Sequence, residues 1–112
     1  MDEAIEMPLT FIRDMARVHA KAKSDRVYLE QFRKTKKAML MVEAEKLGIK
    51  TVSERECFAY AHPDYIQLLD GLRVAVEQEE YYKMQITVAQ LRIELYRTEQ
   101  ANQRAERHGY GA

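Results

Sequence analysis

The 112-residue sequence has 18 basic and 18 acidic residues, so its formal net charge is zero, and 46% of its residues are hydrophobic. It has one cysteine, which excludes an intrachain disulfide, and no apolar run approaches the roughly 20 residues of a membrane-spanning helix. Only four Gly and two Pro interrupt it, a composition typical of all-α proteins.

The first long segment without a helix breaker lies between Pro8 and Gly48. Proline is favoured in the first turn of a helix, where its missing N–H removes no hydrogen bond. Apolar residues then recur at spacings of three and four, and glycine is the preferred residue just after a helix end. The pattern predicts a helix over residues 8–47, with Gly48 as the residue after its C-terminus.

A short connector helix is predicted over residues 54–61. Ser53 and Glu56 match the capping box, in which the serine side chain accepts from the backbone and the glutamate reaches back. The pair His62-Pro63 ends this helix, because the residue before proline avoids the helical region. Asp64 is then expected to cap a second long helix over 64–107, which leaves a tail at 108–112.

The second long helix carries an apolar stripe with the a/d spacing of a coiled coil over more than four heptads, from Tyr65 to Tyr96, interrupted only by Glu79. We call this series the first stripe. Its predicted core and oligomer contacts are Leu68, Leu72, Tyr82, Ile86, Ile93 and Tyr96.

These elements predict an all-α fold in a single domain, residues 1–112. Two long antiparallel helices joined by the short connector helix form a coiled-coil-like helical hairpin. Two helices bury only one stripe each, so we expect the hairpin to assemble into an oligomeric bundle. The number of subunits stays open, as does closure of the hairpin within one chain or by exchange. Lys36 and Glu79 both interrupt apolar stripes and are predicted to form a paired polar layer.

Charge is distributed unevenly. Residues 13–37 hold nine bases and three acids, whereas residues 38–80 hold four bases and nine acids. A basic helix face with interleaved aromatic rings can follow a phosphate backbone and stack on single-stranded bases. The candidate nucleic-acid contacts are Arg26, Tyr28, Arg33, Lys34, Lys36 and Lys37. The alternative interpretation is a solvated helix face that acidic residues balance across the hairpin.

Catalytic and metal-binding motifs are missing from the sequence. It has no Gly-rich phosphate loop, no G-x-S-x-G and no H-E-x-x-H, and its three histidines, His19, His62 and His108, lie far apart. We therefore predict that the chain is not an enzyme, with no catalytic residues, no metal site and no cofactor.

Several short patterns occur together in an unusual combination. The basic run at 33–37 precedes Ala-Met-Leu-Met at 38–41, and Glu-Arg-Glu at 54–56 precedes Tyr-Ala-His-Pro at 60–63. With these patterns, residues 28–45, 53–75 and 91–107 resemble short helical proteins of tailed bacteriophages and prophages, found among early-region DNA-metabolism genes. The resemblance covers about half of the chain. It implies a setting in phage DNA metabolism and brings no catalytic or ligand residues.

Two functions follow as expectations. The first is a non-catalytic accessory protein of phage DNA replication or recombination, which binds single-stranded DNA through the basic helix face and acts as a mediator for a recombinase or single-strand-binding protein. The second is a protein–protein adaptor or inhibitor of a host protein, without nucleic-acid binding. Both predict a homo-oligomer in the cytoplasm of a bacterial host cell, with no membrane contact.

Overall fold

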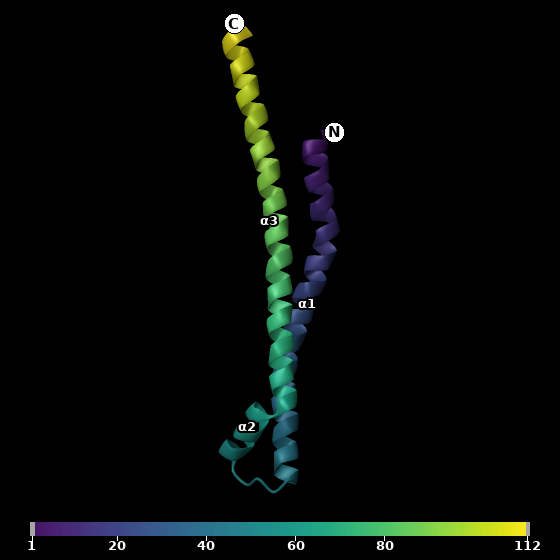
Figure 1. Ribbon diagram of the computed structural model, residues 1–112, viewed down its shortest axis with the longest axis vertical. Coiled ribbons are helices and arrows are strands. Elements are labelled where there is room, and N and C mark those ends of the chain that lie inside the picture. The colour runs from purple at the N-terminus through teal and green to yellow at the C-terminus, as the bar shows by residue number, and fades with distance from the viewer. Residues whose placement is uncertain (1, 112) are drawn as a thin grey trace. The chain divides into compact units, whose positions relative to one another are not determined.

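The computed structural model describes residues 2–111, which form three α-helices and no strand. Helix α1 covers Glu3–Lys46, α2 covers Val52–Ala61 and α3 covers Pro63–Gly111 (Figure 1). The predicted all-α class is confirmed. No helix in this described part of the chain is long and apolar enough to cross a membrane.

The chain divides into two compact units by its internal contacts. One combines residues 1–20 with 80–112, and we call it the terminal unit. The other is residues 21–79, which we call the connector unit because it contains α2. Each unit pairs a segment of α1 with a segment of α3.

Helix α1 begins five residues earlier than predicted. The Asp2 carboxylate accepts a hydrogen bond from the backbone N–H of Ala4 at 2.9 Å, and the Asp2 carbonyl accepts from Glu6 at 2.9 Å. Asp2 is therefore the N-cap, and the negative charges of Glu3 and Glu6 in the first turn favour a helix start. Pro8 lies inside the helix rather than in its first turn.

Helix α1 ends as the glycine position predicts. Gly48 has a φ of +88°, in the left-handed region where a side chain would be strained. The N–H of Ile49 donates to the Ala44 carbonyl at 3.1 Å, and that of Gly48 to Glu45 at 3.0 Å. These two hydrogen bonds are the Schellman pattern, which satisfies carbonyls that the last helical turn leaves open.

The connector helix begins two residues earlier than predicted, because Thr51 caps it rather than Ser53. The Thr51 hydroxyl accepts from the Glu54 N–H at 3.1 Å. The sequence Thr-Val-Ser-Glu-Arg-Glu matches the capping-box pattern twice, at Thr51 and at Ser53, and the structure has the cap at Thr51.

His62, rather than Asp64, caps α3. The His62 Nδ1 accepts from the Asp64 N–H at 3.0 Å, and the His62 carbonyl accepts from Tyr65 at 3.0 Å. Pro63 thus occupies the first helical position, which suits its fixed φ and missing N–H. At the other end, α3 continues to Gly111 through most of the predicted tail, of which Ala112 lies outside the described residues.

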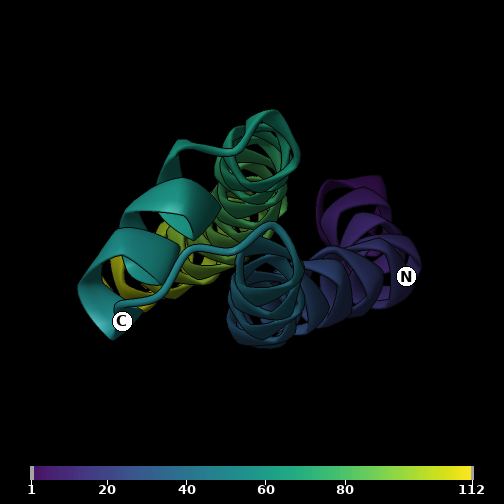
Figure 2. The same ribbon diagram turned by 90° about the horizontal axis from the view of Figure 1, so that it is seen from below.

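The core of the connector unit lies where its three helices meet. Leu40 of α1, Ala59 of α2 and Tyr65 of α3 form one buried cluster, and Met41 packs against it. Ala59 is completely buried, because its methyl side chain lets α2 approach the other two helices closely. Figure 2 shows α2 beside the paired ends of α1 and α3.

The first stripe is turned toward α1 in both units. Tyr65, Ala75, Ala89 and Ile93 are buried. The predicted contacts Leu68, Leu72, Tyr82, Ile86 and Tyr96 are half-buried. The predicted Lys36–Glu79 layer is wrong: Glu79 contacts Arg26, and Lys36 contacts Asp64. The antiparallel register of this unit places Lys36 about three helical turns away from Glu79.

Candidate interaction surfaces

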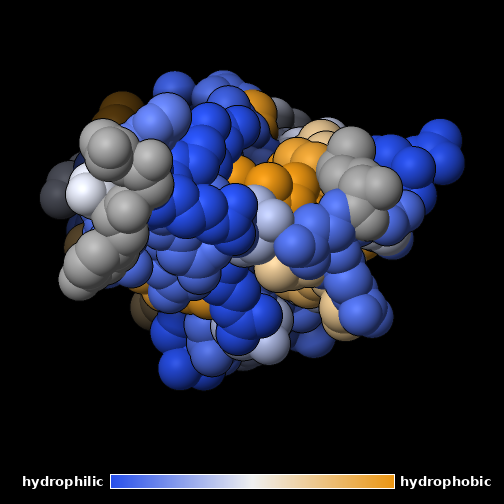
Figure 3. Space-filling model, turned by 90° about the horizontal axis from the view of Figure 1, so that it is seen from above, coloured by the Kyte–Doolittle hydropathy of each residue, from blue (hydrophilic) through white to orange (hydrophobic). Residues whose placement is uncertain are grey.

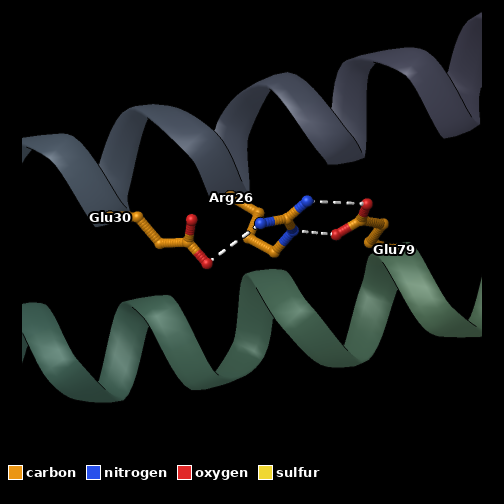
Figure 4. A network of polar contacts seen from close by, with 3 residues as sticks. All are labelled: Arg26, Glu30 and Glu79. Atoms are coloured by element: carbon orange, nitrogen blue, oxygen red, sulfur yellow. Dashed lines mark hydrogen bonds and ion pairs between the residues drawn. The ribbon is translucent and has the colours of Figure 1, made fainter.

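Arg26 joins the two long helices of the connector unit through a polar network. Its guanidinium donates from Nε and Nη2 to the two carboxylate oxygens of Glu79, the second contact at 3.2 Å, and from Nη1 to Glu30 at 2.9 Å (Figure 4). The side chains of Arg26 and Glu79 are only 23% and 12% exposed. Glu79, followed by Glu30, raises the pKa of Arg26 above its usual value. A two-pronged contact of this kind fixes geometry as well as charge.

Lys36 and Lys37 are also held by carboxylates from other helices. Lys36 lies 3.5 Å from Asp64 at the start of α3, and Lys37 lies 3.6 Å from Glu56 of α2. The Lys37 ammonium also sits 4.8 Å from the centre of the Tyr60 ring. A hydrogen bond to Tyr60, and then the charge of Glu56, raise the pKa of Lys37. Both lysines thus form ion pairs between α1 and another helix, Lys36 with α3 and Lys37 with α2.

The other three candidate nucleic-acid contacts do not share one face of α1. Tyr28 is 65% exposed and stacks on Phe32 with ring centres 5.9 Å apart, while Lys34 is exposed and Arg33 is half-buried. Lys34 lies six positions after Tyr28, which turns the two side chains about 120° apart around the helix. Within residues 2–111 neither Arg33 nor Lys34 has an ion-pair partner. The structure therefore does not gather the six residues into one surface.

Arg55 is a structural residue that the sequence interpretation missed. Its Nε donates to the Ile49 carbonyl at 2.7 Å, and its Nη1 lies 3.9 Å from Glu45. It therefore ties the segment after Gly48 to α2. A single arginine in a polar stretch gives no sequence signal for such a contact.

In the terminal unit, a hydrogen bond links Asp2, which is the N-cap of α1, to Tyr96 of α3. The Tyr96 hydroxyl donates to the Asp2 carboxylate at 2.7 Å. This contact, together with the hydrogen bond from Ala4, lowers the pKa of Asp2. The same contact raises the pKa of Tyr96.

The Asp2–Tyr96 contact is expected to make the thermal midpoint of the terminal unit depend on pH. A carboxyl with a lowered pKa stabilises the fold above its unfolded pKa, near 3.8, and loses that contribution as pH falls through the folded pKa. The raised pKa of Tyr96 favours the neutral phenol, so its contribution is complete below about pH 10 and lost above it. The midpoint difference between wild type and Tyr96→Phe should be constant from about pH 5 to 9 and shrink below pH 4.

Circular dichroism melts across this pH series measure the difference. Tyr81→Phe is a matched control, because Tyr81 is 59% exposed and should give no pH-dependent difference. A Tyr96→Phe difference that stays the same at every pH would show that the hydrogen bond does not act on stability.

Many large hydrophobic side chains of this chain are exposed to solvent. Among the residues whose burial the structure describes, eight hydrophobic side chains are buried, whereas many large ones are more than a third exposed, including Met7, Met84 and Leu91. Figure 3 shows such hydrophobic surface in orange between hydrophilic side chains. In the terminal unit an open groove of about 420 Å³ runs between α1 and α3, where Met7, Phe11 and Val88 line it. Exposed apolar area of this extent is typical of surfaces that bind other proteins.

Comparisons with protein-family models, with curated proteins and with solved structures each give no match to this chain. Among the described residues, no three His, Cys, Asp or Glu side chains are placed to hold a metal ion.

Proposed function

We propose that this chain is a non-catalytic helical adaptor, which binds other proteins through apolar helix faces and does not use its basic run to bind nucleic acid. The observation that carries the proposal is the pairing of three of its candidate phosphate-binding cations. Arg26, Lys36 and Lys37 each contact a carboxylate from another helix of the connector unit.

These contacts oppose DNA binding for an energetic reason. Affinity for a nucleic-acid backbone comes from neutralising phosphates and releasing their counterions. A cation that already contacts a carboxylate must give up that partner before it can contact a phosphate. Because the net charge of the chain is zero, no general attraction to DNA offsets this loss.

The adaptor proposal predicts that the chain does not bind single-stranded DNA in a salt-dependent way. Fluorescence anisotropy of a labelled oligonucleotide, at low and high salt, measures this for wild type and for Arg33→Ala/Lys34→Ala. This double variant removes the two candidate nucleic-acid cations that have no ion-pair partner among the described residues. Lys23→Ala, another exposed lysine of α1, is the matched control. Binding that weakens steeply with salt, and that only the double variant loses, would overturn the proposal.

One observation favours the second candidate, a single-stranded DNA accessory protein in phage replication or recombination. The stacked Tyr28–Phe32 pair is open to solvent on one side, because Tyr28 is 65% exposed. Aromatic side chains of this kind can stack on bases, and Lys34 lies within two turns of them on the same helix. Tyr28→Ala should weaken binding in the same anisotropy assay if this candidate is correct.

A further inference from the structure

Helix α3 carries a second apolar series in the terminal unit. Its members are spaced by three and four residues in strict alternation, which is the a/d spacing of a coiled coil. All of them are between 38% and 60% exposed. We call this series the second stripe: Tyr81, Met84, Val88, Leu91 and Leu95.

The second stripe lies on a different face of α3 from the first stripe. In this unit the first stripe continues through Tyr82, Ile86, Ala89, Ile93 and Tyr96, all of which are buried or half-buried. At 100° per residue, the two series point about 140° apart around the helix axis. Helix α3 is therefore apolar on two faces, and the chain itself covers one of them.

The chain as a whole exposes more surface than an average folded monomer of its mass. The chain exposes 8647 Å². A folded monomer of its mass, 13.2 kDa, exposes about 6,400 Å² on average. The excess of about 2,200 Å² is more than twice the roughly 800 Å² that each partner buries in an interface of standard size.

We propose that the second stripe binds the second stripe of another copy of this chain, with the two α3 helices antiparallel. This inference deepens the proposed function, on which it rests, by naming one protein partner. A self-complementary face on each copy gives a closed, two-fold symmetric dimer, which is the commonest oligomer.

The charges beside the stripe select the antiparallel direction. In a parallel pair, Glu94 would face Glu99 of the other copy, and like charges at these flanking positions are destabilising. In an antiparallel pair centred between Val88 and Leu91, Arg92 instead faces Gln85 and Glu94 faces Thr87. The antiparallel pair therefore brings no like charges together at these positions.

An antiparallel pair centred between Val88 and Leu91 also places apolar side chains of the two copies opposite each other. Val88 of one copy packs against Leu91 of the other, and Met84 packs against Leu95. Two-fold symmetry repeats each contact, so four consecutive layers are apolar. The side chains of these four layers are all more than a third exposed in the single chain, so they are available to a second copy.

Light scattering coupled to size exclusion tests the interface on the intact chain. Wild type should have about twice the mass of 13.2 kDa, and Leu91→Glu should have the monomer mass. Leu91 is 57% exposed, so the variant should keep its helical circular dichroism. The matched control Leu9→Glu, at a side chain 44% exposed on α1, should remain dimeric. A monomeric wild type, or a Leu91→Glu variant that stays dimeric, would overturn the proposal.

A second variant tests the direction. In Val88→Lys/Leu91→Glu, an antiparallel pair places each lysine against a glutamate of the other copy, so the dimer mass should return. A parallel pair would oppose lysine to lysine and glutamate to glutamate, so a monomeric double variant contradicts the antiparallel arrangement. These mass measurements do not involve DNA. A chain that does not dimerise would therefore contradict this inference but not the adaptor proposal, which the anisotropy assay tests.

Discussion

Replacing Leu40 by alanine is expected to lower the free energy of unfolding by about 2–5 kcal/mol, because it removes the largest aliphatic side chain of the buried cluster and leaves a cavity. Leu40 is 3% exposed and touches both α2 and α3 through Ala59 and Tyr65. Folded proteins have a free energy of unfolding of only about 5–15 kcal/mol, so this loss is a large fraction of the total. The variant should therefore lose the order of the connector unit.

Urea denaturation followed by circular dichroism, at one protein concentration, measures this loss. Leu47→Ala is the matched control, since Leu47 is 65% exposed and its truncation should change the unfolding free energy by less than about 0.5 kcal/mol. Equal effects of the two substitutions would mean that α2 does not form a core with the long helices.

The second large effect is expected at the Arg26–Glu79 contact. Arg26→Met leaves the carboxylate of Glu79, only 12% exposed, without the guanidinium that meets both of its oxygens. Glu79→Met leaves Arg26 with Glu30 alone. Each single variant should lower the thermal midpoint by several degrees. The double variant should return close to wild type, because an apolar pair of similar volume restores the packing and carries no partly buried charge.

Thermal melts of all four proteins form a double-mutant cycle. If the double variant loses as much as the two single variants together, the two side chains are not coupled, and the contact does not join α1 to α3. Lys21→Met is a useful control, because its ion pair with Asp25 is exposed and lies within α1.

Helix type and the C-terminal cap of α1 could be predicted from the sequence, because they depend on local features. Long segments without breakers define the helices, and Gly48 is the residue that the left-handed cap requires. The N-terminal caps were predicted less well. Thr51 and Ser53 both match a capping box, so the sequence alone does not choose between them, and the structure shows that Thr51 is the cap.

The register of the connector unit could not be predicted, because it depends on contacts between distant residues. Lys36 and Glu79 each interrupt an apolar pattern, but the pattern does not give the relative height of the helices. Arg26 meets Glu79 because Leu40 meets Tyr65 in the core, which fixes the antiparallel alignment. This alignment also pairs half of the candidate nucleic-acid residues with carboxylates.

The second stripe was recognisable in the sequence but was missed. Its spacing from Tyr81 to Leu95 is as regular as that of the first stripe, which begins at Tyr65 and is longer. Two heptad series overlap on α3, and the sequence does not show which of them faces α1. The structure shows it, because the first stripe is buried or half-buried and the second stripe is exposed.

The mass of the wild-type chain in solution tests most directly whether the second stripe binds the second stripe of another copy. We predict a dimer of about twice 13.2 kDa that Leu91→Glu dissociates while its helical signal is kept. A wild-type chain that is monomeric at high micromolar concentration would contradict the dimer, and would leave the exposed second stripe without the partner proposed for it.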